Sequence, residues 1–469
     1  MTRERPSMPR ITRHWRQRLA EASGPAYLAL VDCIAEDARS GRLSPGDRLP
    51  PLREMATDLD LNYSTIARGL AEARKRGLVD SRVGSGTFVR GPAPAMALRD
   101  GNSADMTMNL PPEPDDANLV ARLRASAAAA LGEADPYALL RYQDFGGSPR
   151  ERELGAQWMK PRFPEARAER VLVAPGAHAV LHALVSQLAR PGDTICVEAL
   201  TYPGIKAIAA QLGVRLLPLA DDGAPLPAAF RDACKSAQPK ALYLNPTLNN
   251  PTTRTILRSR REALAEIALA YSVPIIEDDA YGRLVRTAPP AFASLAPELT
   301  WYLTGLSKCV GAGLRTAYVH APGQRQMQRL AGTLRATTVM ASPVTTAIAS
   351  RWIEDGTADA LIDAVRDEAN RRQRIAETEL AAQRYVPRAD SFHLWLPLPK
   401  TVEAGELAGW LRERGVPAVA AVAFSTGTEP PNALRLCLGG QLTREQCAAG
   451  LHLVAEALAH PVVMQGGYL

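Results

Sequence analysis

The stretch TGLSKCVGAGLR, residues 304–315, places a lysine among small residues and an arginine seven positions after it. Lysine is rare here, because only seven of the 55 basic residues are lysine. An arginine side chain stays protonated and can only hold an anion, whereas a lysine amine with a lowered pKa can attack a carbonyl carbon. We therefore take Lys308 as a candidate nucleophile and Ser307 and Arg315 as candidate anion ligands beside it. The alternative is that Lys308 is a solvated surface charge.

Two further stretches follow apolar runs that we predict to be strands. In VLVAPGAHAVLHAL, Ala177 and His178 lie between a strand and the start of a helix, where backbone N–H groups bind phosphate. In EALTYPGI, Tyr202 comes just after a strand, at the edge where open α/β sheets bind ligands. Its ring could stack on a planar ligand or pack in the core.

Polar residues of two more stretches would complete a ligand site. Asp278 and Tyr281 in IIEDDAYGRL follow a strand, and Asn250 lies in the proline-containing loop NPTLNNPTT. A carboxylate beside a pyridine nitrogen keeps that nitrogen protonated, while an amide and a phenol can contact a ring oxygen. The alternative for Asp278 is an N-cap or surface carboxylate, a role that we expect Glu277 and Asp279 to fill instead.

An arginine near the C-terminus adds a possible carboxylate site. Arg435, in NALRLCLGG, lies on an apolar strand. A buried arginine is costly unless it is paired, so it would either clamp a ligand carboxylate or form an internal salt bridge. Together with the residues above, it predicts a site for pyridoxal phosphate, in which Lys308 forms a Schiff base with the cofactor aldehyde.

The elements that must position these residues form an α/β domain. From about residue 117, strand-like runs alternate with helical stretches of 10 to 15 residues, which predicts βαβ units and a mostly parallel sheet with helices on both faces. We expect this domain, residues 117–469, to end in a small α+β subdomain. Residues 91–116 are rich in Pro, Gly, Asp and Ala without periodicity and are predicted to be a linker.

Composition and charge narrow the class of protein. The chain has 469 residues, is 46% hydrophobic, and contains no uninterrupted apolar run long enough to span a membrane. Its polar N-terminus and scattered cysteines favour a reducing cytoplasm and argue against a zinc or other metal site. Residues 1–90 contain 16 basic and 11 acidic residues, so five of the six net positive charges lie there. That imbalance favours a polyanion partner for this region.

Residues 15–90 are predicted to be a helix-turn-helix domain with a β-hairpin wing. Helical periodicity covers 25–43 and the stretch PLREMATDLD, a third helix begins near Asn62, and LVDSRVGSGTFVR alternates around a turn. We assign DNA contacts to the start of the third helix and to nearby arginines, namely Asn62, Tyr63, Ser64, Thr65 and Arg68, with Arg48, Arg53 and Arg82 on phosphates. The alternative is a three-helix module that binds a protein.

The stretches GRLSPGDRLPPLREMA and SRVGSGTFV closely resemble the winged helix of GntR-type bacterial regulators. The order GAHA, TYPG, NNPT, EDDAY, SK-x6-R and LRL resembles the fold-type I aminotransferases. In combination, over about residues 15–465, the chain resembles the MocR subfamily of transcriptional regulators. It departs from the pattern at Tyr63, often arginine, at Gly305, usually Ser or Thr, at NNPTT in place of NNPTG, and at LPPEPDD, which lacks a glycine.

The resemblance implies a role for each candidate residue. Lys308 matches the Schiff-base lysine, Asp278 the partner of the pyridine nitrogen, Tyr281 and Asn250 the contacts to the ring hydroxyl oxygen, Tyr202 the stacking ring, and Ala177, His178, Ser307 and Arg315 the phosphate ligands. Tyr142, in LRYQDFGG, matches a tyrosine that reaches the cofactor phosphate of the neighbouring subunit, and Arg435 matches the carboxylate-binding arginine. A homodimer is therefore expected.

These features predict a cytoplasmic regulator that depends on pyridoxal phosphate and binds operator DNA through its winged helix. It would sense an amino compound, or the cofactor itself, by aldimine chemistry at Lys308. The alternative is an aminotransferase with an accessory DNA-binding domain, in which Lys308 transfers protons, Asp278 holds the ring charge and Tyr281 assists. Its sequence leaves open whether transamination turns over.

Overall fold

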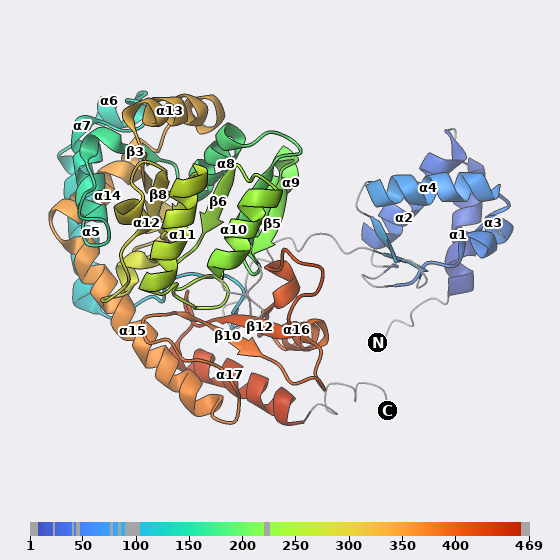
Figure 1. Ribbon diagram of the computed structural model, residues 1–469. Helices are drawn as coiled ribbons and strands as arrows, with labels where there is room; N and C mark the ends of the chain where they lie inside the picture. Colours follow the sequence, from blue (N-terminus) through green and yellow to red (C-terminus); the bar gives the residue numbers. More distant parts are fainter. Residues whose placement is uncertain are drawn as a thin grey trace. The chain divides into compact units, whose positions relative to one another are not determined.

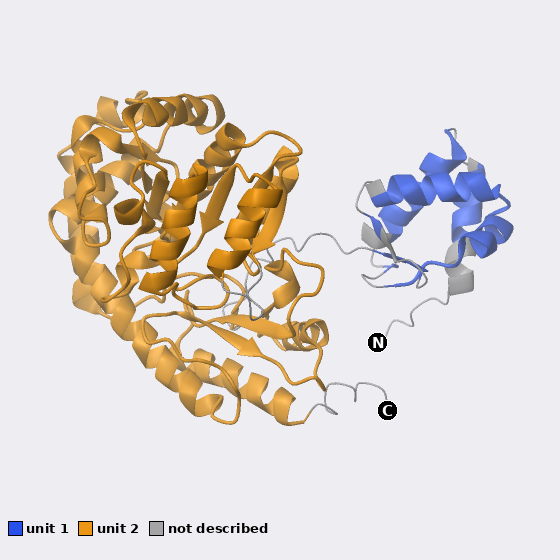
Figure 2. Ribbon diagram, in the orientation of Figure 1, with its two compact units in different colours: residues 1–101 blue, residues 102–469 orange. Residues whose placement is uncertain are grey.

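The computed structural model describes residues 8–21, 24–39, 42–43, 47–75, 78–82, 86–89, 104–219 and 226–460. It divides into two compact units, Met1–Gly101 and Asn102–Leu469, drawn in separate colours in Figure 2. No described helix is both long and apolar enough to cross a membrane.

The small unit is a helical domain with a two-stranded hairpin. Its elements are α1 (Met8–Glu21), α2 (Ala26–Arg39), α3 (Leu52–Leu59), α4 (Tyr63–Lys75), β1 (Val79–Arg82) and β2 (Gly86–Val89). Strands β1 and β2 pair in antiparallel fashion, as the alternation around the Gly-Ser-Gly turn predicts. The apolar positions of α4, Ile66, Leu70 and Ala73, are buried in a common core.

Helix α1 is an addition to the predicted domain, which began at residue 15. The Trp15 ring is fully buried, and its Nε1 donates a hydrogen bond to Asp37 Oδ2 over 2.7 Å. Because Trp15 joins the same apolar cluster as Leu30 and Met55, α1 belongs to the fold of the small unit.

The large unit is built on a seven-stranded mixed sheet of order β3-β9-β8-β7-β6-β4-β5 (Figure 1). Its strands are β3 (Val171–Ala174), β4 (Thr194–Glu198), β5 (Arg215–Leu219), β6 (Ala241–Leu244), β7 (Ile275–Asp278), β8 (Thr300–Gly305) and β9 (Ala317–His320). Strands β5, β4, β6, β7 and β8 pair in parallel, whereas β9 runs antiparallel to both β8 and β3. The predicted α/β class is confirmed.

Helices cover both faces of this sheet. The helices of this unit that precede α15 are α5 (Ala117–Gly132), α6 (Pro136–Leu140), α7 (Pro149–Met159), α8 (Ala177–Leu188), α9 (Pro203–Leu212), α10 (Leu226–Ser236), α11 (Arg258–Tyr271), α12 (Phe292–Leu295), α13 (Gln324–Thr338) and α14 (Pro343–Glu354). In β6, Tyr243 packs with α8 and α9, while Leu242 and Leu244 pack with α10 and α11. This alternation is the two-residue period of a strand buried on both sides.

A smaller α+β subdomain follows the long helix α15 (Thr357–Glu379). It contains β10 (His393–Pro397), α16 (Ala404–Glu413), β11 (Val419–Ala420), β12 (Ala433–Cys437) and α17 (Arg444–Ala459). The strands form an antiparallel sheet of order β10-β12-β11.

Part of the predicted linker belongs to this subdomain. Of residues 91–116, the structure describes 104–116, and these lie in the large unit. Met106 is fully buried, its N–H donates to Pro417 O over 3.1 Å, and its carbonyl accepts from Cys437 N over 2.9 Å. The proline-rich composition of this stretch indicated a linker, but its one buried apolar residue, Met106, attaches it to the subdomain.

Candidate functional site

The predicted cofactor residues converge at the carboxyl edge of the parallel strands. Asp278 is the last residue of β7, and Lys308 ends a 3-10 helix, η3 (Leu306–Lys308), that follows β8 directly. A cavity opens there. Its lining residues are Met108, Leu110, Ala177, His178, Leu181, Tyr202, Asn245, Asn250, Asp278, Ala280, Tyr281, Gly305, Ser307, Lys308, Ala312 and Arg315.

Lys308 has the environment of a reactive amine. Burial lowers the pKa of its amine to about 8, and the nearby Arg435 and Arg315 act in the same direction, whereas Cys437 and Asp278 raise it. Its Nζ donates a hydrogen bond to the carbonyl oxygen of Asn109. About a tenth of this amine is neutral near pH 7, far more than for an ordinary lysine, which makes it a competent nucleophile.

Asp278 is held rigidly beside that lysine. Its Oδ2 accepts a hydrogen bond from the Tyr243 hydroxyl over 2.9 Å, and its backbone carbonyl accepts from Asn245 Nδ2 over 2.6 Å. Burial raises the pKa of Asp278 to about 6, and the Tyr243 hydrogen bond opposes that rise. In the described part of the chain, Oδ1 is buried without a hydrogen-bond partner, so the carboxylate retains one acceptor for a ligand.

The two neighbouring carboxylates are not at the surface, which corrects the expectation for Glu277 and Asp279. Both are fully buried. Glu277 Oε1 lies 3.4 Å from Arg261 Nη1, and Asp279 Oδ2 lies 3.2 Å from Arg162 Nε. Successive side chains of a strand point to opposite faces of the sheet. Glu277 and Asp279 therefore lie on one face, where each forms an ion pair, and Asp278 lies on the other.

The start of α8 and the stretch after η3 form an anion cradle. Gly176 precedes α8 with a φ of 100°, and a Cβ there would come within 2.7 Å of Arg315 Nη2. Only glycine therefore lets the Arg315 guanidinium lie across the helix N-terminus. Ala177, His178 and Ser307 line the same cavity, so the predicted phosphate ligands are brought together.

Tyr202, Asn250 and Tyr281 also line the cavity. Asn250 is fixed by its N–H, which donates to Asn245 Oδ1 over 2.8 Å. Tyr281 is buried, and its hydroxyl accepts a hydrogen bond from Asn109 Nδ2 over 2.9 Å. Tyr202 could thus contact the face of a planar ligand in this cavity, and Asn250 and Tyr281 its edge.

Two predicted site residues do not line the cavity. Tyr142 is 77% exposed. Arg435 is buried on β12, where Nη1 donates to Asn250 Oδ1 over 3.4 Å, Nη2 donates to the Thr107 carbonyl, and the guanidinium lies 5.3 Å from the centroid of the Phe424 ring. Among the described residues, Arg435 does not form the internal salt bridge of the alternative, because its hydrogen bonds go to a backbone carbonyl and an amide oxygen.

Sequence reasoning missed three residues that contact the site. Tyr243 and Asn245 orient Asp278, and Asn109 contacts both Lys308 and Tyr281. The signal for the first two was their place at the end of a strand adjacent to β7. Asn109 carried no signal of its own, because it lies in the stretch whose composition indicated a linker.

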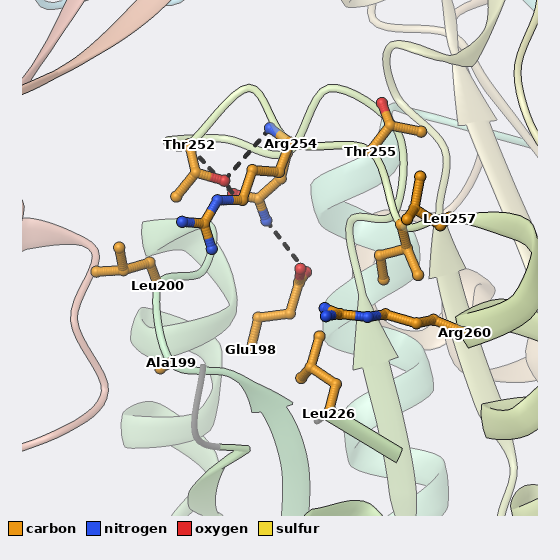
Figure 3. A pocket seen from close by; sticks show the side chains of 11 residues that line it. Glu198, Ala199, Leu200, Leu226, Thr252, Arg254, Thr255, Leu257 and Arg260 are labelled. Carbon is orange, nitrogen blue, oxygen red and sulfur yellow. Dashed lines mark hydrogen bonds between the residues drawn. The ribbon is translucent and has the colours of Figure 1, made fainter. Parts of the chain in front are cut away.

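A second pocket is lined by Glu198 at the end of β4 and by Asn249, Thr252 and Arg254 of the loop after β6 (Figure 3). The Glu198 carboxylate accepts a hydrogen bond there from Asn249 Nδ2 over 3.1 Å, and Arg254 and Arg260 extend toward it. Its lining includes no lysine. The cavity around Lys308 is therefore the candidate site.

Five of the predicted DNA contacts lie in the first two turns of α4 or directly before them. Asn62 directly precedes α4, and Tyr63, Ser64 and Thr65 form its first turn, with Tyr63 55% exposed. Arg68 is exposed on α4, with its guanidinium 4.2 Å from the Tyr27 ring centroid.

The other three arginines predicted to contact DNA, Arg48, Arg53 and Arg82, also belong to the small unit. The backbone of Arg48 forms an isolated antiparallel β-bridge with Phe88 of the hairpin. Arg53 is exposed on α3. Arg82 lies in β1, and its side chain is outside the described part. An exposed helix N-terminus with basic residues nearby is the arrangement that reads base edges and phosphates.

A chain with this fold and this site belongs to the GntR-type transcriptional regulators that carry an aminotransferase domain, the architecture of the MocR subfamily. Residues 26–89 match the family of bacterial regulatory proteins named gntR, and residues 111–453 match the aminotransferases of class I and II.

The chain is 30% identical to the HTH-type transcriptional regulator YdeF of Bacillus subtilis, over 95% of this chain and 96% of that protein. It is 24% identical to the vitamin B6 salvage pathway transcriptional repressor PtsJ of Salmonella typhimurium, over 82% of this chain and 89% of that one. The structure of LysN, an α-aminoadipate aminotransferase from Thermus thermophilus complexed with N-(5'-phosphopyridoxyl)-L-leucine, has a TM-score of 0.69 and covers 78% of this chain and 94% of its own, at 24% identity.

Proposed function

We propose that this protein is a transcriptional regulator that binds DNA through its winged helix and pyridoxal phosphate through the cavity around Lys308. The observation that carries the proposal is the lysine amine with a lowered pKa in the same cavity as an anion cradle and a buried carboxylate, joined in one chain to a GntR-type domain. Neither unit alone would imply a regulator that responds to a ligand.

The residues present fit this cofactor. Asp278 Oδ1 is a buried acceptor without a partner among the described residues, suited to a protonated ring nitrogen. The α8 N-terminus, Ser307 and Arg315 suit a phosphate dianion. When bound, the cofactor would supply an aldehyde carbon and an electron-withdrawing ring.

The protein's own groups would prepare that chemistry. With a pKa of about 8, the Lys308 amine is partly neutral near neutral pH, so Lys308 would hold the cofactor through a nucleophilic amine. With a pKa of about 6, the Asp278 carboxyl is mostly ionised at the same pH. Tyr202 would cover one ring face, while Tyr281 and Asn250 would contact the ring oxygen.

The sensed ligand is either the cofactor itself or an amino compound that exchanges with Lys308. The likeness to a vitamin B6 salvage pathway transcriptional repressor over 82% of this chain supports the first, because that protein's name connects transcriptional repression with this vitamin. Either ligand can change DNA binding only through different affinities for two states of the protein.

An aminotransferase is the second candidate function. It is favoured by the presence of Lys308, Asp278, Tyr281 and a buried Arg435, and by the likeness to a solved aminotransferase. The engagement of Arg435 by Thr107 and Asn250 argues against rapid turnover of amino acids. Multiple turnovers at roughly 1 to 1000 per second would favour it over the regulator.

We also propose a homodimer. Tyr137, Leu140 and Tyr142 are 76%, 81% and 77% exposed within six residues of one another, on α6 and just after it. Large apolar side chains grouped at a surface indicate a contact with another protein. A second copy that covers them would bring Tyr142 to its neighbour, the role that this tyrosine has in the resemblance.

Spectroscopy and DNA selection test the proposal. The purified protein with added pyridoxal phosphate should show a visible absorption band that borohydride removes, and Lys308→Ala should abolish that band. A pool of random duplexes should yield a specific fragment whose affinity changes when the cofactor or a candidate amine is added. A colourless native protein would refute cofactor binding, and the absence of any retained fragment would refute the regulator.

A further inference from the structure

Residues 107–110 form a short span between two backbone anchors, and Met108 and Leu110 of this span line the cavity. Before the span, Met106 is fully buried and pairs through its N–H with Pro417 and through its carbonyl with Cys437. After it, the Pro111 carbonyl accepts a hydrogen bond from Gly440 N over 3.0 Å. Movement is therefore confined to the four residues between the anchors.

The span engages the two cationic groups that a ligand would use. The Thr107 carbonyl accepts a hydrogen bond from Arg435 Nη2, and the Asn109 carbonyl accepts one from Lys308 Nζ. Arg435 Nε is buried without a partner among the described residues. A carboxylate that bound Arg435 through Nε and Nη2 together would need the position that the Thr107 carbonyl holds.

Asp105 keeps that carbonyl in place. Its Oδ1 accepts hydrogen bonds from Thr107 N over 2.7 Å and from the Thr107 hydroxyl over 2.5 Å. These two contacts fix the backbone of Thr107 immediately before its carbonyl. Burial lowers the pKa of Arg435, and Cys437, Tyr281 and, least of the three, Asp105 act against that fall.

We propose that Asp105 is a positioning residue that controls the access of a ligand carboxylate to Arg435, because it holds the Thr107 carbonyl on the guanidinium. The inference rests on the proposed function, in which amines exchange with Lys308. An amino acid must displace the carbonyl of Thr107 before its carboxylate can bind. An amine without a carboxylate does not have to displace this carbonyl. The native protein should therefore bind an amino acid only slightly more tightly than the corresponding amine.

The test compares 2-aminopentanoic acid with butylamine, which differ only by the carboxylate, in spectral titrations of the full-length protein with cofactor. In Asp105→Ala, the affinity ratio of amino acid to amine should rise about tenfold, the value of one charge-assisted hydrogen bond. Asp105→Asn retains the oxygen acceptor and should keep nearly the native ratio. Asp116→Ala, which removes the N-cap of α5 and no site contact, is the matched control.

Three results would overturn the inference. One is an unchanged ratio in Asp105→Ala, and another is a ratio in Asp105→Asn as high as in Asp105→Ala, because charge rather than position would then be responsible. The third is a hydrogen-exchange rate of the peptide 107–110, measured without cofactor, that Asp105→Ala does not change. We expect Asp105→Ala to accelerate this exchange and Asp116→Ala to leave it unchanged. This readout is independent of cofactor binding, so a colourless native protein would sink the proposed function and leave the exchange result standing.

Discussion

Tyr243 and Asp278 lie on neighbouring parallel strands, and the tyrosine hydroxyl donates a hydrogen bond to Asp278 Oδ2 over 2.9 Å. The contact engages one carboxylate oxygen and leaves the other, Oδ1, without a partner among the described residues. It also opposes the rise in the pKa of Asp278 that burial causes. A residue in the core of the sheet thereby determines how much of the carboxylate is ionised near neutral pH.

Tyr243→Phe should weaken cofactor binding in a pH-dependent way. Without this hydrogen bond, the pKa of Asp278 will rise above its value of about 6, so the carboxyl will take up a proton at a higher pH. For a rise of about one pKa unit, the value of one hydrogen bond, we expect the cofactor Kd to increase roughly twofold near pH 7, with a larger effect at about pH 6 than at about pH 8. Spectral titrations across this range measure it.

Tyr318→Phe is the control for that variant. Tyr318 is a buried tyrosine of β9 whose hydroxyl has no hydrogen-bond partner in the described part of the chain. Its substitution should leave the Kd and its pH dependence unchanged. An equal effect in both variants would show that Asp278 is not the group concerned.

Lys308→Met should stabilise the cofactor-free protein. The pKa of this amine falls from 10.5 to about 8 on folding, so the folded state binds the proton less tightly than the unfolded state. The cost is fully present below about pH 8 and disappears as the pH rises toward 10.5. We expect the free energy of unfolding to increase by roughly 1 to 3 kcal/mol near pH 7. Thermal unfolding with and without the substitution tests this, and a lower melting temperature would contradict it.

Arg261→Met should strongly destabilise the large unit. Arg261 is fully buried, donates to the carbonyl oxygens of Pro246 and Ile256, and pairs with Glu277. Its loss leaves a buried carboxylate unpaired, at a cost of about 3 to 5 kcal/mol. Because burial already raises the pKa of Glu277 to about 7, protonation relieves part of this cost at lower pH. The destabilisation should therefore be smaller at about pH 5 than at about pH 8.

Arg258→Met, on the same helix, is the control for that effect. Arg258 forms an exposed pair with Glu262 over 2.9 Å, with 73% of its side chain accessible. An exposed pair contributes about 1 kcal/mol or less. Urea unfolding followed at a large-unit tryptophan such as Trp301 compares the two variants, and similar losses would refute the special role of Arg261.

Arg68→Ala should weaken DNA binding with little change in sequence preference. The guanidinium lies against the Tyr27 ring on the exposed side of α4, which suits a phosphate contact. Removing one phosphate contact reduces the slope of log affinity against log salt by about 1. Arg150→Ala, which removes an exposed pair with Glu354 in the large unit, should leave the slope unchanged. Binding of the selected operator at several salt concentrations decides between them.

Leu140→Asp should convert the proposed dimer to a monomer. Leu140 is 81% exposed between Tyr137 and Tyr142, and a charge in a covered apolar contact is costly to bury. Sedimentation should show half the native mass, with weaker cofactor binding if Tyr142 serves the neighbouring site. A native protein that is already monomeric with cofactor bound would refute the dimer.

Most of the architecture was predictable from the sequence because its signals are local. Strand-like runs such as ALYLN and VPIIEDD, each followed by a helical period, predict the parallel sheet, and a polar residue at each strand end predicts the shared site edge. Lys308 stood out because lysine is rare in this chain, whereas Tyr202 followed from its place just after a strand. Their roles remain predictions until a ligand is bound.

The contacts that sequence reasoning missed are those between distant segments. Asn109 meets Lys308 across 199 positions, and Arg435 meets Thr107 across 328. Neither pair has a periodicity or a motif that links its members. Glu277 and Asp279 were expected at the surface because charged residues usually lie there, and only the fold supplies Arg261 and Arg162 as buried partners.

The attachment of Met106 and Pro111 to residues 417–440 also has a consequence for biosynthesis. Gly439 lies so close to this stretch that a Cβ would come within 1.8 Å of the Leu110 carbonyl oxygen. The first segment of the large unit to leave the ribosome can dock only after nearly the whole chain has been translated, whereas the winged helix closes through contacts within its first hundred residues. On each nascent chain, the DNA-binding unit is therefore complete well before the cavity around Lys308 exists.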